Sequence, residues 1–226
     1  MSGEVIAAVA FVALVIVLAL WKAGHRSSVL AQVVRLGFAP CEEEAPGLQQ
    51  AFLRLAGGYA SGKKMQYEIS QSTRKNEAGK SAYHFTAHNI THLDSHWRHN
   101  MVPPQTDVFL IELGQAGKDS PRPASVFLAP PMGALGRRLI QQVVDLRALG
   151  ARLTIPAQHA ASMLAAFGAD VGSLHDHLSA TALERLSRGG KLGIMAVHFG
   201  EGKAAFECLP EKRDVAAQWS YVREWL

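Results

Sequence analysis

The chain has 226 residues, of which 48% are hydrophobic and 19% charged, and 23 Lys and Arg against 19 Asp and Glu give a formal net charge of +4. This length supports one ordinary domain with its own core, plus an appendage, and the balanced composition excludes a disordered chain. Two Cys exclude a disulfide-dense scaffold and a Cys₄ metal centre. The small net charge predicts that nucleic acid is not a partner.

The N-terminus carries an uncharged apolar run from Val5 to Trp21, with no helix breaker. As a helix, about 17 residues at about 1.5 Å each reach about 25 Å, which is near the lower limit for crossing a bilayer. Trp21 falls where an interfacial ring would lie. The residues before the run are not basic, which argues against a cleaved signal peptide. The sequence therefore predicts a transmembrane anchor within residues 1–24.

Basic residues follow this run, whereas only Glu4 precedes it. Lys22, Arg26 and Arg35 are the basic residues, and the positive-inside rule places their side in the cytoplasm. The expected location is the inner (cytoplasmic) membrane, with the N-terminus outside and a cytoplasmic globular domain. Cys41 and Cys208 are then expected to be reduced thiols.

Small residues recur along the predicted span, at Ala7, Ala10 and Ala13. They would let a second transmembrane helix pack closely, although alanine is also simply common in anchors. Residues 25–58 are predicted to form a juxtamembrane helical segment. Within it, residues 26–38 form an amphipathic helix that either lies on the membrane surface or packs into a core.

Residues 59–226 are predicted to form an α+β globular domain. Alternating and β-branched segments predict strands at 65–70, 81–93, 108–111, 125–128 and 152–155, with a polar loop at 71–80. Apolar stripes and a capping box that begins at Thr181 predict helices at 135–149, 181–189 and 214–226, and residues 159–167 form a short Ala-rich helix or turn. Residues 192–208 contain the clearest hairpin. The expected fold is an N-terminal transmembrane helix followed by a mainly antiparallel sheet flanked by helices.

This order of segments is similar to that of a known group of proteins. An apolar N-terminus, a segment that ends in Leu36-Gly37-Phe38, a strand at 126–128 and a glycine hairpin before the last helix resemble uncharacterised bacterial single-pass membrane proteins with a cytoplasmic α+β domain. The resemblance implies topology. It carries no catalytic residue.

Five histidines follow one another at His84, His88, His92, His96 and His99. On a helix, histidines four residues apart could bind zinc, and His88, His92 and His96 are the candidate ligands. On a strand they share a face but lie about 13 Å apart, too far for one ion. The surrounding aromatic and β-branched residues favour the strand and a polar, imidazole-lined surface.

Two other segments are candidates for chemistry. A glycine-containing turn precedes Arg137 and Arg138 and could hold an anion, although it lacks the lysine and hydroxyl of a phosphate-binding loop. His175, Asp176 and His177 are adjacent, which indicates a loop surface. No nucleophile, zinc-protease or paired-carboxylate signature occurs, so no catalytic residue and no cofactor are predicted.

The sequence predicts a non-catalytic accessory or scaffold subunit that binds another integral membrane protein or complex, as well as the lipid bilayer. A secretion, envelope, respiratory or photosynthetic assembly would each fit. The alternative is a membrane-bound metal-dependent enzyme that uses the histidines at 84–99.

Overall fold

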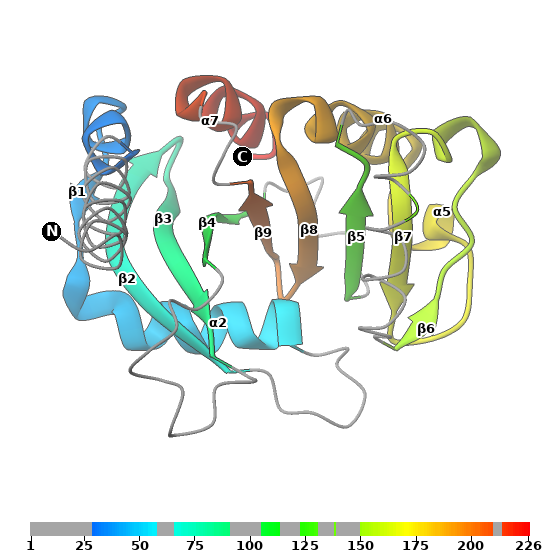
Figure 1. Cartoon of the computed structure of the whole chain (residues 1–226), viewed down its shortest axis with the longest axis horizontal. Helices are drawn as coiled ribbons and strands as arrows, with labels where there is room; N and C mark the ends of the chain where they lie inside the picture. Colours follow the sequence, from blue (N-terminus) through cyan, green and yellow to red (C-terminus); the bar gives the residue numbers. More distant parts are fainter. Residues whose placement is uncertain are drawn as a thin grey trace, which may run out of the picture.

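The computed structural model describes residues 29–57, 66–90, 105–113, 123–130, 138, 150–209 and 214–226. These residues form a nine-stranded sheet with the order β1-β2-β3-β4-β9-β8-β5-β7-β6 (Figure 1). All pairs of neighbouring strands are antiparallel. The strands are β1 (Ala39–Pro40), β2 (Tyr67–Glu77), β3 (Lys80–Asn89), β4 (Gln105–Glu112), β5 (Ala124–Leu128), β6 (Ala151–Arg152), β7 (Met163–Gly168), β8 (Ile194–Gly200) and β9 (Lys203–Cys208).

One helix, α2 (Ala45–Gly57), covers one face of the sheet, which we call the α2 face. A 3₁₀ turn, η1 (Glu42–Glu44), leads into it. Leu48, Phe52 and Leu55 recur at a helical spacing and pack on the strands. Phe52 contacts the rings of Tyr67 and Phe85 at centroid distances of 4.9 and 5.7 Å. The helix as a whole lies against β2, β8 and β9, and Phe52 reaches β3 through Phe85.

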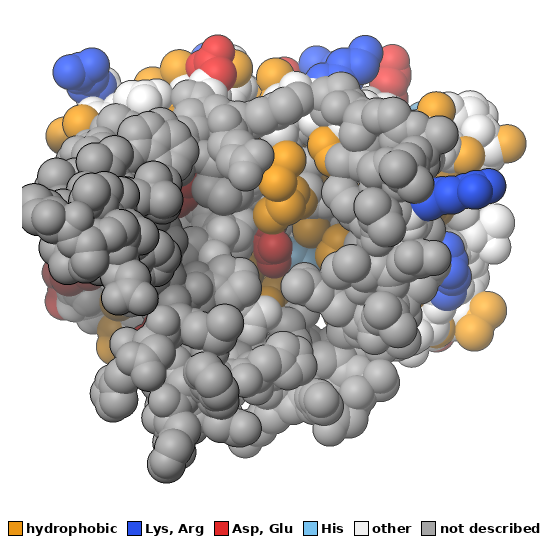
Figure 2. Space-filling model, viewed as in Figure 1, with side chains coloured by type: hydrophobic (Ala, Val, Ile, Leu, Met, Phe, Trp, Pro, Cys, Tyr) orange, Lys and Arg blue, Asp and Glu red, His pale blue; other side chains and the backbone are white. Residues whose placement is uncertain are grey.

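The other face, the back face, carries the larger core. The helix at residues 29–35, α6 (Ala180–Gly189) and α7 (Val215–Arg223) all contribute buried side chains to it. Figure 1 shows α6 and α7 along the top of the view and α2 along the bottom. Trp219 of α7 packs on Phe38 and Phe109 at centroid distances of 4.9 and 5.8 Å. In Figure 2, the basic side chains of the described residues lie mainly at the periphery of the view.

The side chains of strand β4 alternate between the two hydrophobic cores. Val108 and Leu110 belong to the core under α2, whereas Phe109 and Ile111 belong to the back-face core. A strand that is covered on both faces needs apolar residues at every position. This requirement explains the continuous run of apolar residues that predicted the strand.

Two tight turns set the register of the hairpins. Ala78 and Gly79 connect β2 to β3, and Glu201 and Gly202 connect β8 to β9, with φ between +51° and +76° at all four residues. Two consecutive residues of positive φ form the type I′ turn, whose twist matches that of the flanking strands. The second hairpin places Lys203 opposite Glu112 on β4.

The membrane part of the prediction is corrected. Within the described ranges, no helix is both long and apolar enough to span a membrane. The longest of these helices, α2, has 13 residues, and at about 1.5 Å per residue it falls well short of a hydrocarbon core of about 30 Å. This finding contradicts the predicted fold with a transmembrane helix and the predicted location in the inner membrane. The apolar run at 5–21 itself lies outside the described residues.

Three predicted elements also differ. Residues 71–77, predicted as a loop, continue β2 after an irregularity between Ser70 and Thr73. Residues 163–167, predicted as part of a helix or turn at 159–167, belong to strand β7 between β5 and β6. The helix at 29–35 buries Val29 and Val33 in the back-face core, as the core-packing interpretation predicted. The predicted helix at 135–149 lies outside the described residues, apart from Arg138.

Candidate functional site

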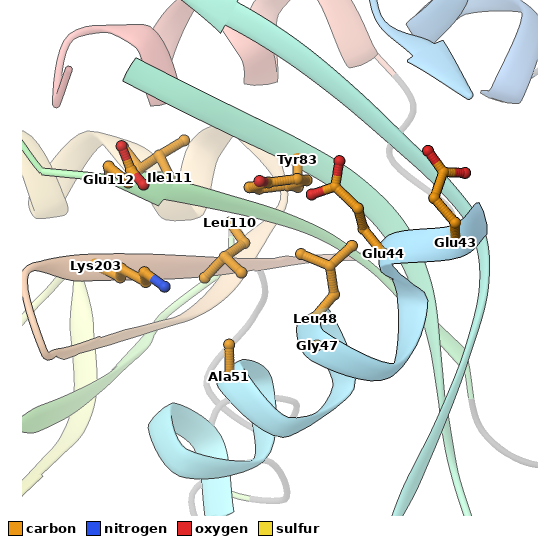
Figure 3. A pocket seen from close by; sticks show the side chains of 10 residues that line it. All are labelled: Glu43, Glu44, Gly47, Leu48, Ala51, Tyr83, Leu110, Ile111, Glu112 and Lys203. Carbon is orange, nitrogen blue, oxygen red and sulfur yellow. The ribbon is translucent and has the colours of Figure 1, made fainter. Parts of the chain in front are cut away.

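A cleft of about 390 Å³ opens between the N-terminal half of α2 and the strands β3, β4 and β9. Its floor is apolar, and Leu48, Ala51 and Leu110 contribute to it. Its edges are charged, because Glu43 and Glu44 come from η1 while Glu112 and Lys203 come from β4 and β9. Figure 3 shows the Lys203 amine pointing into the cleft toward Leu110 and the Glu44 carboxylate pointing toward the ring of Tyr83. We call this feature the α2 cleft; Gly47, Tyr83 and Ile111 complete its lining.

Local sequence explains why the cleft forms here. Pro46 lies in the first turn of α2, where a missing N–H costs nothing, and Gly47 has no side chain to fill the space. No heavy atom lies within 4 Å of a Cβ built on Gly47. The spacing of Leu48 and Ala51 turns both toward the sheet. The helix therefore touches the sheet through its apolar side and leaves the charged end of η1 at the rim.

Two of the cleft carboxylates are held by neighbours inside the protein. Arg74 donates from Nη1 to Glu44 Oε1 at 3.0 Å, and Glu44 also hydrogen-bonds Tyr83. Burial, followed by this bond to Glu44, raises the pKa of the Tyr83 hydroxyl. The backbone N–H of Ser81 donates to Glu112 Oε2 at 3.4 Å.

Glu43 and Lys203 differ from these two. Neither side chain makes a hydrogen bond or an ion pair with another residue of the described ranges. They are the cleft charges that remain for a ligand. Because Arg74 neutralises Glu44, the two carboxylates of Glu43 and Glu112 against the single ammonium of Lys203 leave the cleft weakly negative in a chain whose formal net charge is +4.

A second polar cluster lies on the α2 face, across three strands. Ser125 Oγ lies 2.8 Å from His198 Nδ1, and His198 Nε2 lies 3.0 Å from Glu207 Oε1. Ser125 and His198 are opposite each other in the β5–β8 ladder. A hydroxyl, an imidazole and a carboxylate in one chain of hydrogen bonds resemble the groups that activate a nucleophile.

The surroundings of this cluster argue against that chemistry. Ser125 is 0% exposed and His198 is 2% exposed, so both side chains are almost completely shielded from solvent. β5 is paired with β7 on one side and with β8 on the other, which commits its backbone N–H groups to the ladders. A buried polar group that is fully hydrogen-bonded stabilises one packing arrangement, and removing a partner costs about 1–3 kcal/mol. We therefore assign the cluster to stability.

The histidine row is only partly within the described residues. His84 and His88 lie on β3 and share its back face, as predicted for a strand. His88 Nε2 lies 2.8 Å from Ser70 Oγ. His84 is buried, which corrects the prediction of a surface: its ring packs on Phe109 at 4.8 Å, and burial lowers its pKa. His92, His96 and His99 lie outside the described residues. Among the residues that are described, no group of three His, Cys, Asp or Glu could hold a metal ion.

The remaining sequence candidates do not meet at one place. Arg35 is exposed on the helix at 29–35, and Arg138 is exposed as well. The other proposed anchor, packing and anion-contact residues lie outside the described part of the chain; they are Ala7, Ala10, Ala13, Trp21, Lys22, Arg26 and Arg137. Cys41 and Cys208 are both free and buried thiols.

The segment around His177 is not the loop surface that was predicted. His177 lies on α5 (Leu174–His177), its side chain is fully buried, and its Nε2 is 3.3 Å from Asp170 Oδ1. Asp176 instead accepts a hydrogen bond from the backbone N–H of Ser173 and completes a capping box. These bonds hold the short helix in place, whereas His175 is exposed.

Sequence reasoning missed both the cleft and the Ser125–His198–Glu207 cluster. In the sequence, Glu43 and Glu44 lie within the segment predicted to be helical at 25–58, and Lys203 lies within the predicted hairpin at 192–208, so no local pattern connects them. Only the strand order places Lys203 and Glu112 beside η1, because β4 and β9 are about ninety residues apart in the chain but adjacent in the sheet. The lone His198 inside an apolar strand was the one available signal for the cluster.

The chain matches no family model, no curated protein and no solved structure. The resemblance to bacterial single-pass membrane proteins therefore gains no support from these comparisons.

Proposed function

We propose that this protein is a non-catalytic accessory protein that binds a partner protein through the α2 cleft. The observation that carries the proposal is the cleft itself, with an apolar floor and with charged groups, Glu43 and Lys203, that no described residue engages. An apolar floor with a polar rim is the usual anatomy of a protein-binding surface. In the Ser125–His198–Glu207 cluster the hydroxyl and the imidazole are buried and only Glu207 is partly exposed, which favours binding over catalysis.

Site-specific photo-crosslinking in the native host tests this proposal. A photoreactive amino acid replaces Gly47, which is exposed, lines the cleft and has room for a side chain. The matched control carries the same amino acid at Glu184, which is exposed on α6. We expect a discrete heavier adduct from the Gly47 position that is missing from the Glu184 position, and its second component, once purified, should bind the unlabelled protein.

Two results would contradict the proposal. One is the absence of any adduct from Gly47 under conditions in which the photoreactive group is shown to be active. The other is the same set of adducts from both positions, since random collision does not depend on the cleft.

A further inference from the structure

The charge of the α2 cleft restricts what can occupy it. Of its three carboxylates, Glu44 is paired with Arg74, which leaves Glu43 and Glu112 against one ammonium group, that of Lys203. A cleft of one sign raises the local concentration of ligands of the opposite sign and speeds their encounter. The cleft therefore attracts cations even though the whole chain is formally positive.

The position of the apolar residues defines the rest of the ligand. Leu48, Ala51 and Leu110 form the floor between the two charged ends, as Figure 3 shows. An apolar side chain of a partner would cover this floor, and a neighbouring basic side chain would then reach the rim. Lysine and arginine suit such a place, because their long aliphatic stems can lie on apolar surface while the charge stays in water.

We infer that the α2 cleft binds a partner segment in which an aliphatic or aromatic residue is next to lysine or arginine. This inference rests on the proposed function and adds the chemistry of the partner. Glu43 supplies the carboxylate that no described residue engages, whereas Glu44 is already held by Arg74 and Tyr83. The positive charge of Lys203 repels the same basic ligand, because the amine points into the cleft.

The inference predicts that removing the negative charge of Glu43 and removing the positive charge of Lys203 change the affinity in opposite directions. Replacing Glu43 with Gln should weaken binding of a basic apolar segment. Replacing Lys203 with Met, which keeps the length of the side chain and removes its charge, should strengthen the same binding. Each change should amount to roughly two- to fivefold in Kd at low salt, the range for one partly exposed charge pair.

Fluorescence anisotropy of the full chain with two short synthetic peptides measures these effects. One peptide alternates leucine with arginine, and the other alternates leucine with glutamate. The proteins are the native chain, Glu43→Gln, Lys203→Met, and Glu184→Gln as a control that removes an exposed carboxylate away from the cleft. We expect the arginine peptide to bind more tightly, with opposite effects of the two cleft variants, no effect of the control, and weaker binding as salt is added.

Other outcomes overturn the inference without overturning the proposed function. If the glutamate peptide binds more tightly than the arginine peptide, and if Lys203→Met weakens that binding, the occupant is an anion held by Lys203. Equal affinity in all variants, or binding of neither peptide, would show that the cleft does not select a basic segment. The proposed function fails separately, when the Gly47 crosslink is also missing.

Discussion

The buried imidazole of His84 shows how one residue can make stability depend on pH. His84 is 2% exposed, its ring lies against Phe109, and no described residue bonds its Nδ1. Burial lowers its pKa below the ordinary value of 6.5, and the nearby carboxylate of Asp107 only partly opposes this shift. The neutral imidazole is therefore the form that the fold accepts.

The pH dependence follows from this shift. Below pH 6.5 the unfolded chain is protonated at His84, whereas the folded chain keeps the imidazole neutral. The free energy of unfolding is therefore highest above that pH and decreases as the pH falls. In His84→Phe, which cannot ionise, the free energy of unfolding should fall less between pH 7 and pH 5, by at most about 1.4 kcal/mol per pH unit. Urea denaturation at a series of pH values measures the difference, with His175→Phe as the exposed control. Parallel pH curves for the native chain and His84→Phe would contradict the prediction.

At the scale of elements, the close approach of α6 to the sheet depends on glycine. A Cβ on Gly190, the residue after α6, would lie 2.3 Å from the backbone oxygen of Ala129, and a Cβ on Gly189 would lie 2.8 Å from Leu128 Cδ1. Backbone atoms next to a paired strand cannot move aside at low cost. The pair of glycines therefore sets how near α6 lies to β5.

Two glycine-to-alanine substitutions should therefore have opposite effects on stability. Gly190→Ala forces the backbone apart and should lower the free energy of unfolding by about 1–3 kcal/mol. Gly47→Ala meets no atom within 4 Å and lies in a helix, so it should raise the free energy of unfolding by about 0.5–1 kcal/mol. Urea midpoints of the two variants and the native chain provide the comparison. Stabilisation by Gly190→Ala would show that the contact with Ala129 is not tight.

At the scale of the whole molecule, local patterns predicted most elements but not their partners. The hairpin of β8 and β9, the apolar strands β4 and β5 and the terminal helix α7 follow from periodicity and turn residues. β7 was missed because its sequence, MLAAFG, contains alanines that favour a helix, whereas its burial between β5 and β6 favours a strand. The cleft and the Ser125–His198–Glu207 cluster depend on strand order, which no local pattern contains.

The C-terminal helix α7 completes the back-face core, so its removal should affect the stability of the whole domain. Trp219 packs on Phe38 and Phe109, and Trp225 packs on Phe199 and Phe206 at 5.5 and 5.8 Å. The chain end is also held by polar contacts, since Lys80 Nζ donates to the backbone oxygen of Leu226. Residues that are far apart in the sequence, from Phe38 to Phe206, thus pack against Trp219 and Trp225.

Deletion of residues 214–226 should therefore abolish the folded state. Burial of a large apolar side chain contributes about 1.5–3 kcal/mol, so losing Trp219, Tyr221, Val222 and Trp225 together removes an amount comparable to the whole stability of an ordinary domain, about 5–15 kcal/mol. The measurements are the soluble yield and the urea unfolding curve of the truncated chain. Glu224→Gln is the matched control, because its ion pair with Arg188 is exposed and worth at most about 1 kcal/mol. A truncated chain that unfolds cooperatively at the native midpoint would mean that the sheet holds its back-face core without α7.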